Sequence, residues 1–188
     1  MVQHRQTRVT TKDDWQTPVQ LFKKLDRRFS FTGDACASLD NALSPRFFTE
    51  KTDALRSNWS DLGDSVFINP PYSKSHEFVA RSWRAVRDGE VKRVVAVVPS
   101  TCEVRWFHDY VIGKASEIWF TKGRINFINP ETGSEGQSNV VGTAIIVWDG
   151  ARVGWTNTSI WGMCSKTFEP TGHVSNSVFM GAPQVSLI

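Results

Sequence analysis

The sequence lacks the cysteine and histidine spacings that mark disulfide frameworks and zinc sites. Its cysteines (Cys36, Cys102 and Cys164) are far apart, and no Cys-x-x-Cys pair occurs. This pattern predicts free thiols, a reducing compartment and no bound metal. There is no run of 18 apolar residues, so we expect no membrane-spanning helix and no membrane partner. The polar N-terminus differs from a signal peptide, and we therefore expect a cytoplasmic protein.

Neither sign of charge dominates the composition. Lys and Arg number 22 and Asp and Glu number 19, which gives a net charge of +3 and a pI near 8.9. Such a balance is compatible with a polyanionic partner without requiring one. Aromatic residues are abundant, with eight Trp and twelve Phe. They supply core volume and stacking surfaces for flat ligands.

The length of 188 residues, 40% of them hydrophobic, predicts one domain with a substantial core. We expect a flexible arm at residues 1–13, a main domain at 14–150 and a partly docked C-terminal extension at 151–188 with a loose end. The arm could contact a phosphate backbone or be a solvated tail. The docking residues of the extension are expected to be Trp155, Ile160 and Trp161.

Apolar runs and helical patterns alternate along the chain. Strands are expected at 29–35, 66–68, 91–98, 117–120 and 140–148, and helices at 18–29, 77–86 and 104–112. Thr17 is expected at the N-cap of the first helix and Pro18 at its first helical position. The alternation predicts an α/β fold with a mostly parallel sheet and one antiparallel strand near the C-terminal end.

The second expected strand ends abruptly at Asn69-Pro70-Pro71-Tyr72. The two prolines fix φ near −65° and donate no backbone hydrogen bond, so neither a strand ladder nor a helix continues through them. Such a turn would hold Asn69 and Tyr72 in fixed directions at the carboxyl end of a strand, where open α/β sheets bind ligands. The alternative is a strand that simply ends at a Pro-Pro turn.

Two further segments can be interpreted either as parts of a ligand site or as ordinary structural features. Asp34 is followed by the small residues Ala35, Cys36 and Ala37 at another expected strand end. This arrangement suits close approach of a ligand to a carboxylate, whereas a solvated turn aspartate is the alternative. Trp15-x-Thr17-Pro18 is explained locally by a helix start alone.

Taken together, the motifs resemble those of the phage-type DNA N6-adenine methyltransferases (Dam family), which depend on S-adenosylmethionine. The resemblance covers about residues 14–148. Its Asn-Pro-Pro-Tyr tetrapeptide is shared with enzymes that methylate guanine or protein glutamine, but the order of all five pieces is more specific. The pieces are, in chain order, Asp14-Trp15-x-Thr17-Pro18, Asp34-x-Cys36-Ala37, Asn41, Asn69-Pro70-Pro71-Tyr72 and Gly123-Arg124-x-x-Phe127.

This resemblance implies a Rossmann-like methyltransferase fold and a role for each motif residue. Asn69 and the carbonyl of Pro70, held by the turn that Pro71 completes, would accept hydrogen bonds from the adenine amine. Tyr72 would stack on an adenine that is flipped from a duplex or presented in a single strand. Arg124 and Phe127 would contact the adenine or a nearby phosphate, and for Phe127 a plain core position is an equal alternative.

The resemblance also implies a site for S-adenosylmethionine. Trp15, Thr17 and Pro18 would surround its methionine part, Asp34 and the backbone of Ala35, Cys36 and Ala37 would line the same region, and Asn41 and Asp53 would contact ribose or adenine. The glycine-rich first loop of the wider superfamily is replaced by Ala35-Cys36-Ala37-Ser38.

The sequence contains no segment that resembles a separate target-recognition domain. Only residues 129–139 and 150–175 are free to reach base edges, so we expect short or relaxed sequence specificity. Two alternatives remain open: methylation of RNA or of protein glutamine, and a catalytically silent module that binds the cofactor or DNA. The resemblance further implies a role in phage DNA modification or restriction-modification.

Overall fold

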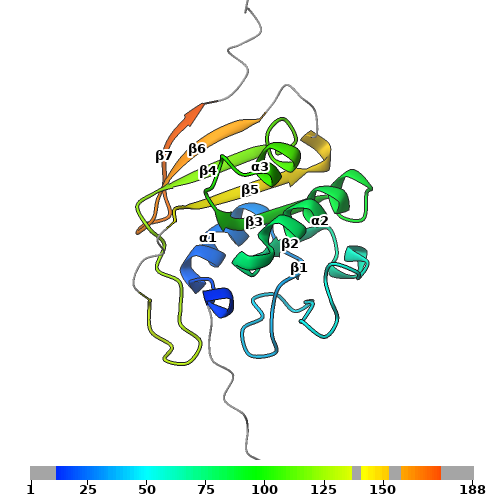
Figure 1. The fold of residues 1–188 in the computed structure, drawn as a ribbon, viewed down its shortest axis with the longest axis horizontal. Coiled ribbons are helices and arrows are strands. Elements are labelled where there is room, and N and C mark those ends of the chain that lie inside the picture. Colours follow the sequence, from blue (N-terminus) through cyan, green and yellow to red (C-terminus); the bar gives the residue numbers. More distant parts are fainter. Residues whose placement is uncertain (1–11, 137–140, 153–157, 175–188) are drawn as a thin grey trace, which may run out of the picture.

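Seven strands join into one sheet in the part of the chain that the computed structural model describes, which comprises residues 12–136, 141–152 and 158–174 (Figure 1). The strands are β1 (Gly33–Asp34), β2 (Ser65–Ile68), β3 (Arg93–Pro99), β4 (Glu117–Lys122), β5 (Thr143–Asp149), β6 (Ser159–Cys164) and β7 (Pro170–Val174). The α-helices in these ranges are α1 (Val19–Phe29), α2 (Ser75–Arg87) and α3 (Arg105–Tyr110). Short 3-10 helices are η1 (Lys12–Asp14), η2 (Trp59–Leu62), η3 (Tyr72–Lys74) and η4 (Gly150–Arg152). Of the expected arm at residues 1–13, only the last two residues are described, and Trp155 also lies outside the described residues.

The sheet is mixed, with the strand order β1-β2-β3-β5-β4-β6-β7. The first three strands are parallel to one another, as are β4 and β6. In contrast, β5 is antiparallel to both β3 and β4, and β7 is antiparallel to β6. The expected α/β fold is therefore confirmed, but the expectation of a mostly parallel sheet is wrong, because half of the strand pairs are antiparallel. That the fold is Rossmann-like stays a prediction.

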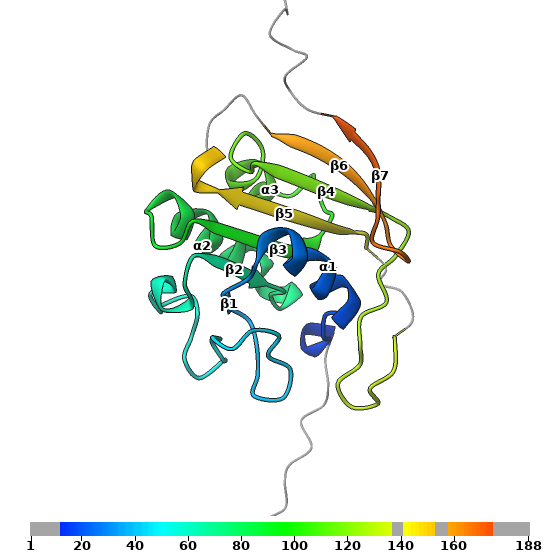
Figure 2. The same ribbon diagram turned by 180° about the vertical axis from the view of Figure 1, so that it is seen from behind.

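The sheet is the middle of three layers. On β3, Val94, Ala96 and Val98 face the layer of α2 and α3. Val95 and Val97, which alternate with them, face α1 on the other side. Figures 1 and 2 show these two faces, with α2 and α3 in front in the first view and α1 in front in the second. Because both faces are covered, the strand is apolar at successive positions and does not alternate.

The first helix begins one residue later than its sequence predicts. Pro18 has φ −55° and ψ 129°, which is not helical, and its carbonyl oxygen accepts a hydrogen bond from the N–H of Phe22 at 3.1 Å. Pro18 is thus the N-cap, and the expectations of Thr17 as N-cap and Pro18 as first helical residue are wrong. The apolar face of α1 is buried as expected, through Leu21, Phe22, Leu25 and Phe29.

The first strand is much shorter than the predicted 29–35. Ser30 has a left-handed backbone with φ 51°, and the carboxylate of Asp26 accepts a hydrogen bond from the N–H of Phe31. These features turn the chain sharply after α1, so that only Gly33 and Asp34 pair with β2. A side chain at Gly33 would not fit, because its Cβ would lie 2.5 Å from the Cβ of Leu62.

The C-terminal residues form more regular structure than the sequence indicates. Both β6 and β7 belong to the main sheet, through β4, and neither was predicted as a strand. Trp161 was expected to dock on the main domain, and its indole does so by stacking on that of Trp119 at a centroid distance of 4.7 Å. In contrast, Ile160 is largely exposed.

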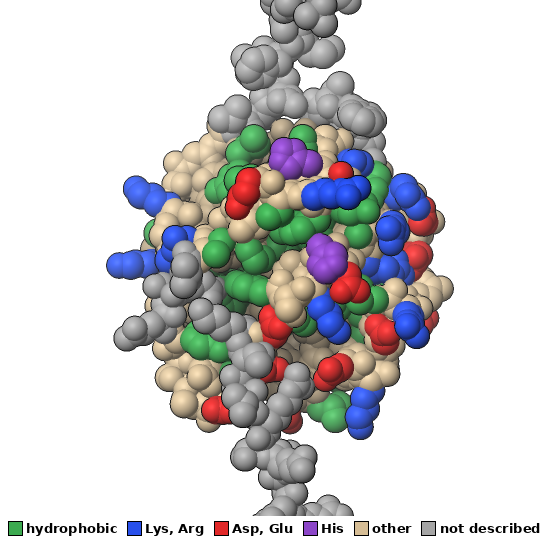
Figure 3. Space-filling view, in the orientation of Figure 1, with side chains coloured by type: hydrophobic (Ala, Val, Ile, Leu, Met, Phe, Trp, Pro, Cys, Tyr) green, Lys and Arg blue, Asp and Glu red, His purple; other side chains and the backbone are tan. Residues whose placement is uncertain are grey.

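The surface over α2 and α3 carries both signs of charge (Figure 3). Arg81 pairs with Glu90 at 2.6 Å, and Arg87 pairs with Asp88 at 2.7 Å. The guanidinium of Arg84 lies over the ring of Tyr110. The arginines of α2 are thus engaged locally, and acidic groups are interspersed among them. None of the helices in the described ranges has the length and apolar character needed to span a membrane.

The position of a side chain in the three layers should determine how much it contributes to stability. Ile146 on β5 is 0% exposed among side chains of α2 and α3, whereas Ile160 on β6 is 46% exposed. We expect Ile146→Ala to lower the free energy of unfolding by about 2–5 kcal/mol, since it leaves a cavity in a packed core. Ile160→Ala, the matched control, should cost at most about 1 kcal/mol. Urea titrations of both variants measure this, and equal losses would contradict the layer assignment.

Candidate functional site

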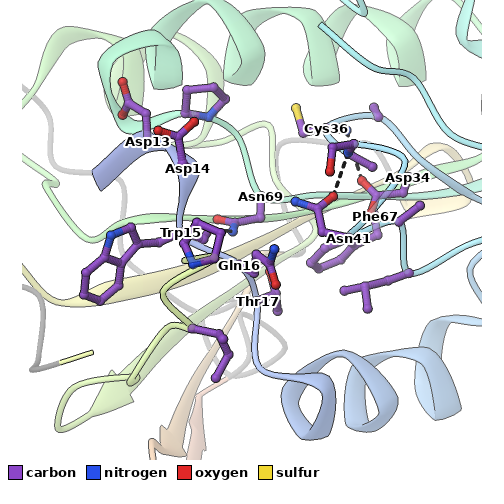
Figure 4. Close-up of a pocket in the computed structure, with 18 of the residues that line it drawn as sticks. Asp13, Asp14, Trp15, Gln16, Thr17, Asp34, Cys36, Asn41, Phe67 and Asn69 are labelled. Carbon is purple, nitrogen blue, oxygen red and sulfur yellow. Dashed lines mark hydrogen bonds between the residues drawn. The ribbon is translucent and has the colours of Figure 1, made fainter. Parts of the chain in front are cut away.

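A cleft of about 2550 Å³ lies at the carboxyl ends of β1 and β2. Pockets for a single small ligand are typically about 300–1,000 Å³, so this cleft has room for more than one ligand. Figure 4 shows how strand ends and the segment before α1 meet around it. The lining residues lie within 13–20, 34–43, 48–56, 67–78, 123–135 and 165–168.

Asn69 is the first residue after β2 and projects into this cleft beside the Trp15–Thr17 segment (Figure 4). Its Nδ2 donates a hydrogen bond to the carbonyl oxygen of Trp15 at 3.3 Å. A carbonyl oxygen only accepts, so the nitrogen of the Asn69 amide must be the atom that faces it. The Asn69 Oδ1 is then an acceptor whose direction is fixed by the other half of the same amide.

The turn after Asn69 separates its four residues. Pro71 lines the cleft, whereas Pro70 is buried and is absent from the lining. Tyr72 begins η3 and also lies outside the lining residues. Its ring is edge-on to that of Phe127 at a centroid distance of 6.4 Å. The structure therefore brings Asn69 and Pro71 to the cleft, whereas Pro70 and Tyr72 are not among its lining residues.

Tyr72 is held as a neutral phenol. Burial raises the pKa of Tyr72 to about 12, against the opposing effect of a hydrogen bond with the Thr143 side chain. Phe127 is 3% exposed and packs in the core on the α1 face of the sheet. Its position corresponds to the plain core alternative and not to a lining residue. Arg124, in contrast, is exposed and lines the cleft.

The segment before α1 (residues 13–18) is held against residues 128–136, which follow β4. Gln16 and Ile128 exchange two backbone hydrogen bonds, each 2.9 Å long. The indole of Trp15 packs directly on Gly136, where an added Cβ would lie 1.7 Å from a ring atom. Glycine is thus the residue that fits under this indole. Trp15, Thr17 and Pro18 all line the cleft. That they hold the cofactor stays a prediction.

Asp34 is a buried carboxylate at the wall of the cleft. It is 3% exposed and accepts hydrogen bonds from the backbone N–H groups of Cys36, at 3.0 Å, and Leu43. Burial raises the pKa of Asp34 to about 6, and the two N–H groups oppose this rise. The carboxylate is therefore mostly ionised at neutral pH. Burial, with the nearby Asp34 charge, raises the pKa of the Cys36 thiol well above its ordinary value, so the thiol is neutral.

The remaining predicted cofactor residues also line the cleft, but their polar groups have local partners. Asn41 Oδ1 accepts a hydrogen bond from the N–H of Ser38 at 2.6 Å. Asp53 has a left-handed φ of 47° and accepts a hydrogen bond from the N–H of Leu55 at 3.2 Å. Both side chains thus shape the loops after β1. Ala35 and Ala37 are the small lining residues next to Cys36.

The charge of the cleft differs from that of the chain. Its lining contains nine Asp and Glu residues against five Lys and Arg residues, whereas the whole chain carries a net charge of +3. An excess of carboxylates favours a positively charged ligand in the cleft. All three cysteines of the chain are free thiols in the structure.

The family model for "DNA N-6-adenine-methyltransferase (Dam)" matches residues 4–167 of the 188. The chain belongs to this family. Among Dam-type proteins, it is 33% identical over 144 residues to the DNA N-6-adenine-methyltransferase of Haemophilus phage HP1 (strain HP1c1), with 74% of this chain and 80% of the relative covered. It is 26% identical over 151 residues to that of Escherichia phage T1, where it covers 72% of this chain and 62% of the relative. The expected Dam-family resemblance is thereby confirmed.

Two solved structures resemble the chain weakly. The Type IIL restriction-modification enzyme MmeI in complex with DNA matches with a TM-score of 0.44 and 14% identity, over 81% of this chain and 24% of the other. A DrdV-DNA complex matches with a TM-score of 0.30 and 17% identity, over 54% of this chain and 14% of the other. Similarity at this level supports no statement about function.

Sequence reasoning about the Dam-type motifs missed several lining residues. Asp13, which was expected in the flexible arm, accepts hydrogen bonds from Ser73 and lines the cleft. Lys166 and Phe168 also line it and come from the turn between β6 and β7. The two strands were not predicted, so nothing in the sequence placed this turn near the site. The Asp-Asp pair before Trp15 was a usable signal for Asp13.

The burial of Asp34 predicts a pH-dependent stability. A carboxyl group that titrates near 3.8 when unfolded and near 6 when folded stabilises the fold fully below pH 3.8, and this contribution is lost as the pH rises through 6. Asp34→Asn removes the titration. Its free energy of unfolding relative to wild type should therefore rise between pH 4 and pH 7, by on the order of 3 kcal/mol, since one pKa unit is about 1.4 kcal/mol. Denaturant titrations across this range measure it, and a constant difference would contradict the assignment.

Proposed function

We propose that this Dam-family protein transfers a methyl group from S-adenosylmethionine to the exocyclic amine of adenine in DNA. The observation that supports this most directly is the Oδ1 of Asn69, an oriented acceptor in the cleft beside the segment of Trp15. The phage relatives are described as DNA N-6-adenine-methyltransferases, in agreement with this reaction.

An oriented acceptor is what this chemistry requires of the protein. The lone pair of an exocyclic adenine amine is delocalised into the ring, so the amine is a poor nucleophile. Hydrogen bonds from the amine to Asn69 Oδ1 and to the carbonyl oxygen of Pro70 would fix its orientation for in-line transfer. Catalysis would then rest on positioning and electrostatics, without a protein nucleophile.

The residues of the cleft fit S-adenosylmethionine, whose sulfonium and amino groups are both cationic. When bound, this cofactor supplies a methyl group activated by the positive sulfur. The buried carboxylate of Asp34 and the overall excess of acidic side chains suit its charge. The residues that would hold it are Trp15, Thr17, Pro18, Asp34, Ala35, Cys36, Ala37, Asn41 and Asp53. Asn41 and Asp53 each already accept one backbone hydrogen bond. Their contacts to the cofactor would therefore use the acceptor positions that remain on their side-chain oxygens.

For the substrate side, Tyr72 would stack on an adenine that is flipped out of a duplex or presented in a single strand. Its neutral, half-buried phenol is compatible with a stacking surface. Arg124 would contact a phosphate from the exposed rim of the cleft. Residues 159–164 and 170–174 form β6 and β7, so the loop after Phe127 and the short turn at 165–169 are the main described segments left for base contacts. Sequence specificity would therefore be short or relaxed. Methylome sequencing that finds one strict six-base site would disprove this.

We further infer that the protein acts in the cytoplasm of a bacterial host, since the named relatives are phage proteins. Methylation of RNA or of protein glutamine, and a silent binding module, remain as outcomes of the test below.

Replacement of Asn69 tests the proposal. Asn69→Ala should lower the rate of N6-methyladenine formation in unmodified DNA by about 10²–10³-fold, because it removes an acceptor used in the transition state. Binding of S-adenosylmethionine, measured by calorimetry, should weaken by at most about tenfold, because Asp34 stays in place and only one hydrogen bond to the Trp15 segment is lost.

Asn58→Ala is the matched control, because Asn58 caps η2 and is not among the cleft residues. This variant should keep full activity. Labelled cofactor offered with DNA, RNA or protein separates the alternatives: label in RNA or protein alone, or no transfer by wild type despite cofactor binding, would refute the proposed reaction.

A further inference from the structure

We propose that Asp13 is a positioning residue for the methyl transfer, acting through Ser73 on the turn that carries Asn69. This inference rests on the proposed function. Asp13 lies in the segment expected to be a flexible arm, yet both of its carboxylate oxygens are engaged. Oδ1 accepts a hydrogen bond from the backbone N–H of Ser73 at 3.1 Å, and Oδ2 accepts one from the Ser73 hydroxyl at 2.6 Å.

The turn needs an external anchor because its own backbone offers few donors. Pro70 and Pro71 have no N–H and so donate no backbone hydrogen bond. The carbonyl oxygen of Pro71 still accepts one, from the N–H of Lys74 at 3.0 Å, but this bond lies within the turn and its continuation. Ser73 is the second residue after the prolines, and both its N–H and its hydroxyl are bound by Asp13. One carboxylate thereby supplies an anchor from outside the turn.

Both ends of the turn are held by one short segment. Asn69, at the start of the turn, donates to the carbonyl oxygen of Trp15, and Ser73, at its end, donates to Asp13. Asp13 and Trp15 are only two residues apart, so the two anchors move together. The segment is itself fixed by the backbone pair of Gln16 with Ile128. Asp13 therefore controls where Asn69 Oδ1 points without touching it.

Charged hydrogen bonds of this kind are well suited to the task. A carboxylate that accepts two hydrogen bonds from one residue fixes the direction as well as the distance of that residue. The contact is exposed, so water can replace either hydrogen bond when it is lost, and the net contribution to stability is small. Its loss should therefore appear in the geometry of the turn more than in the stability of the fold.

Kinetics of four variants test the proposal: Asp13→Ala, Asp13→Asn, Ser73→Ala and the double variant Asp13→Ala/Ser73→Ala. Asp13→Ala should lower kcat for DNA methylation by about 10–100-fold, since small displacements of a reacting group have effects of this size. KM for DNA and for S-adenosylmethionine should each change by less than about threefold. Asp13→Asn should retain most activity, because its amide can accept from the Ser73 N–H and donate to the Ser73 hydroxyl.

The double variant separates action through Ser73 from a direct role. Once Asp13 is removed, loss of the Ser73 hydroxyl should have no further effect, so the double variant should match Asp13→Ala. Additive losses in kcat, or a large increase in either KM, would overturn the proposal. Asp64→Ala is the control: it removes an exposed carboxylate that binds Lys92 at 2.7 Å, outside the cleft, and should leave kcat unchanged.

An NMR measurement that does not depend on methyl transfer can tell failure of this proposal apart from failure of the proposed function. The side-chain amide signals of Asn69 in a ¹H–¹⁵N spectrum are identified by their absence in Asn69→Ala. Asp13→Ala should shift or broaden these signals, and Asp64→Ala should not. Unchanged Asn69 signals in Asp13→Ala would overturn the proposal, whereas an inactive wild type with the expected shifts would refute only the methyl transfer.

Discussion

The hydrogen bond from the side chain of Asn69 to the carbonyl oxygen of Trp15 is the contact on which the cleft depends. It joins the end of β2, a strand buried between β1 and β3, to a segment 54 residues earlier. A carbonyl oxygen requires a donor, which an amide provides and an ionised carboxylate does not. This explains why asparagine suits position 69 in this chain: an aspartate would set two acceptors against each other and lose the fixed direction of the side chain.

The sheet determines where polar groups can be placed around this contact. Every residue of β2 is buried, and β3 is buried at all but its two ends. Asn69 is the first residue after β2 and is only partly buried, so its amide reaches the cleft at a small desolvation cost. Asp34 is 3% exposed and has a large desolvation cost, as its raised pKa shows, which two backbone N–H groups reduce. The polar site is therefore built at strand ends, supported by a rigid apolar layer.

The sequence predicted those features that depend on neighbours along the chain. The apolar face of α1 follows from the spacing of Leu21 and Leu25, and the end of β2 follows from Pro70. Pairings between distant segments were not accessible in the same way. The position of β5 between β3 and β4, and the contact of Asp13 with Ser73 across 60 residues, depend on the assembled sheet. The strand β6 was missed because Gly162 and the exposed Ile160 weaken its pattern.

The charge of the cleft constrains how the two ligands of the proposed reaction share it. A cationic cofactor is favoured beside the carboxylates, whereas DNA phosphates are repelled by them. Asp34 lies on the β1 side, but Arg124 and Lys166 follow β4 and β6, which are parallel and end at the same edge of the sheet. The cofactor is therefore expected on the β1 side and phosphate on the β4–β6 side. Asn69 directly follows β2, which lies between β1 and the β4–β6 pair in the strand order. An acceptor is needed at this intermediate position if one bound molecule is to be presented to the other.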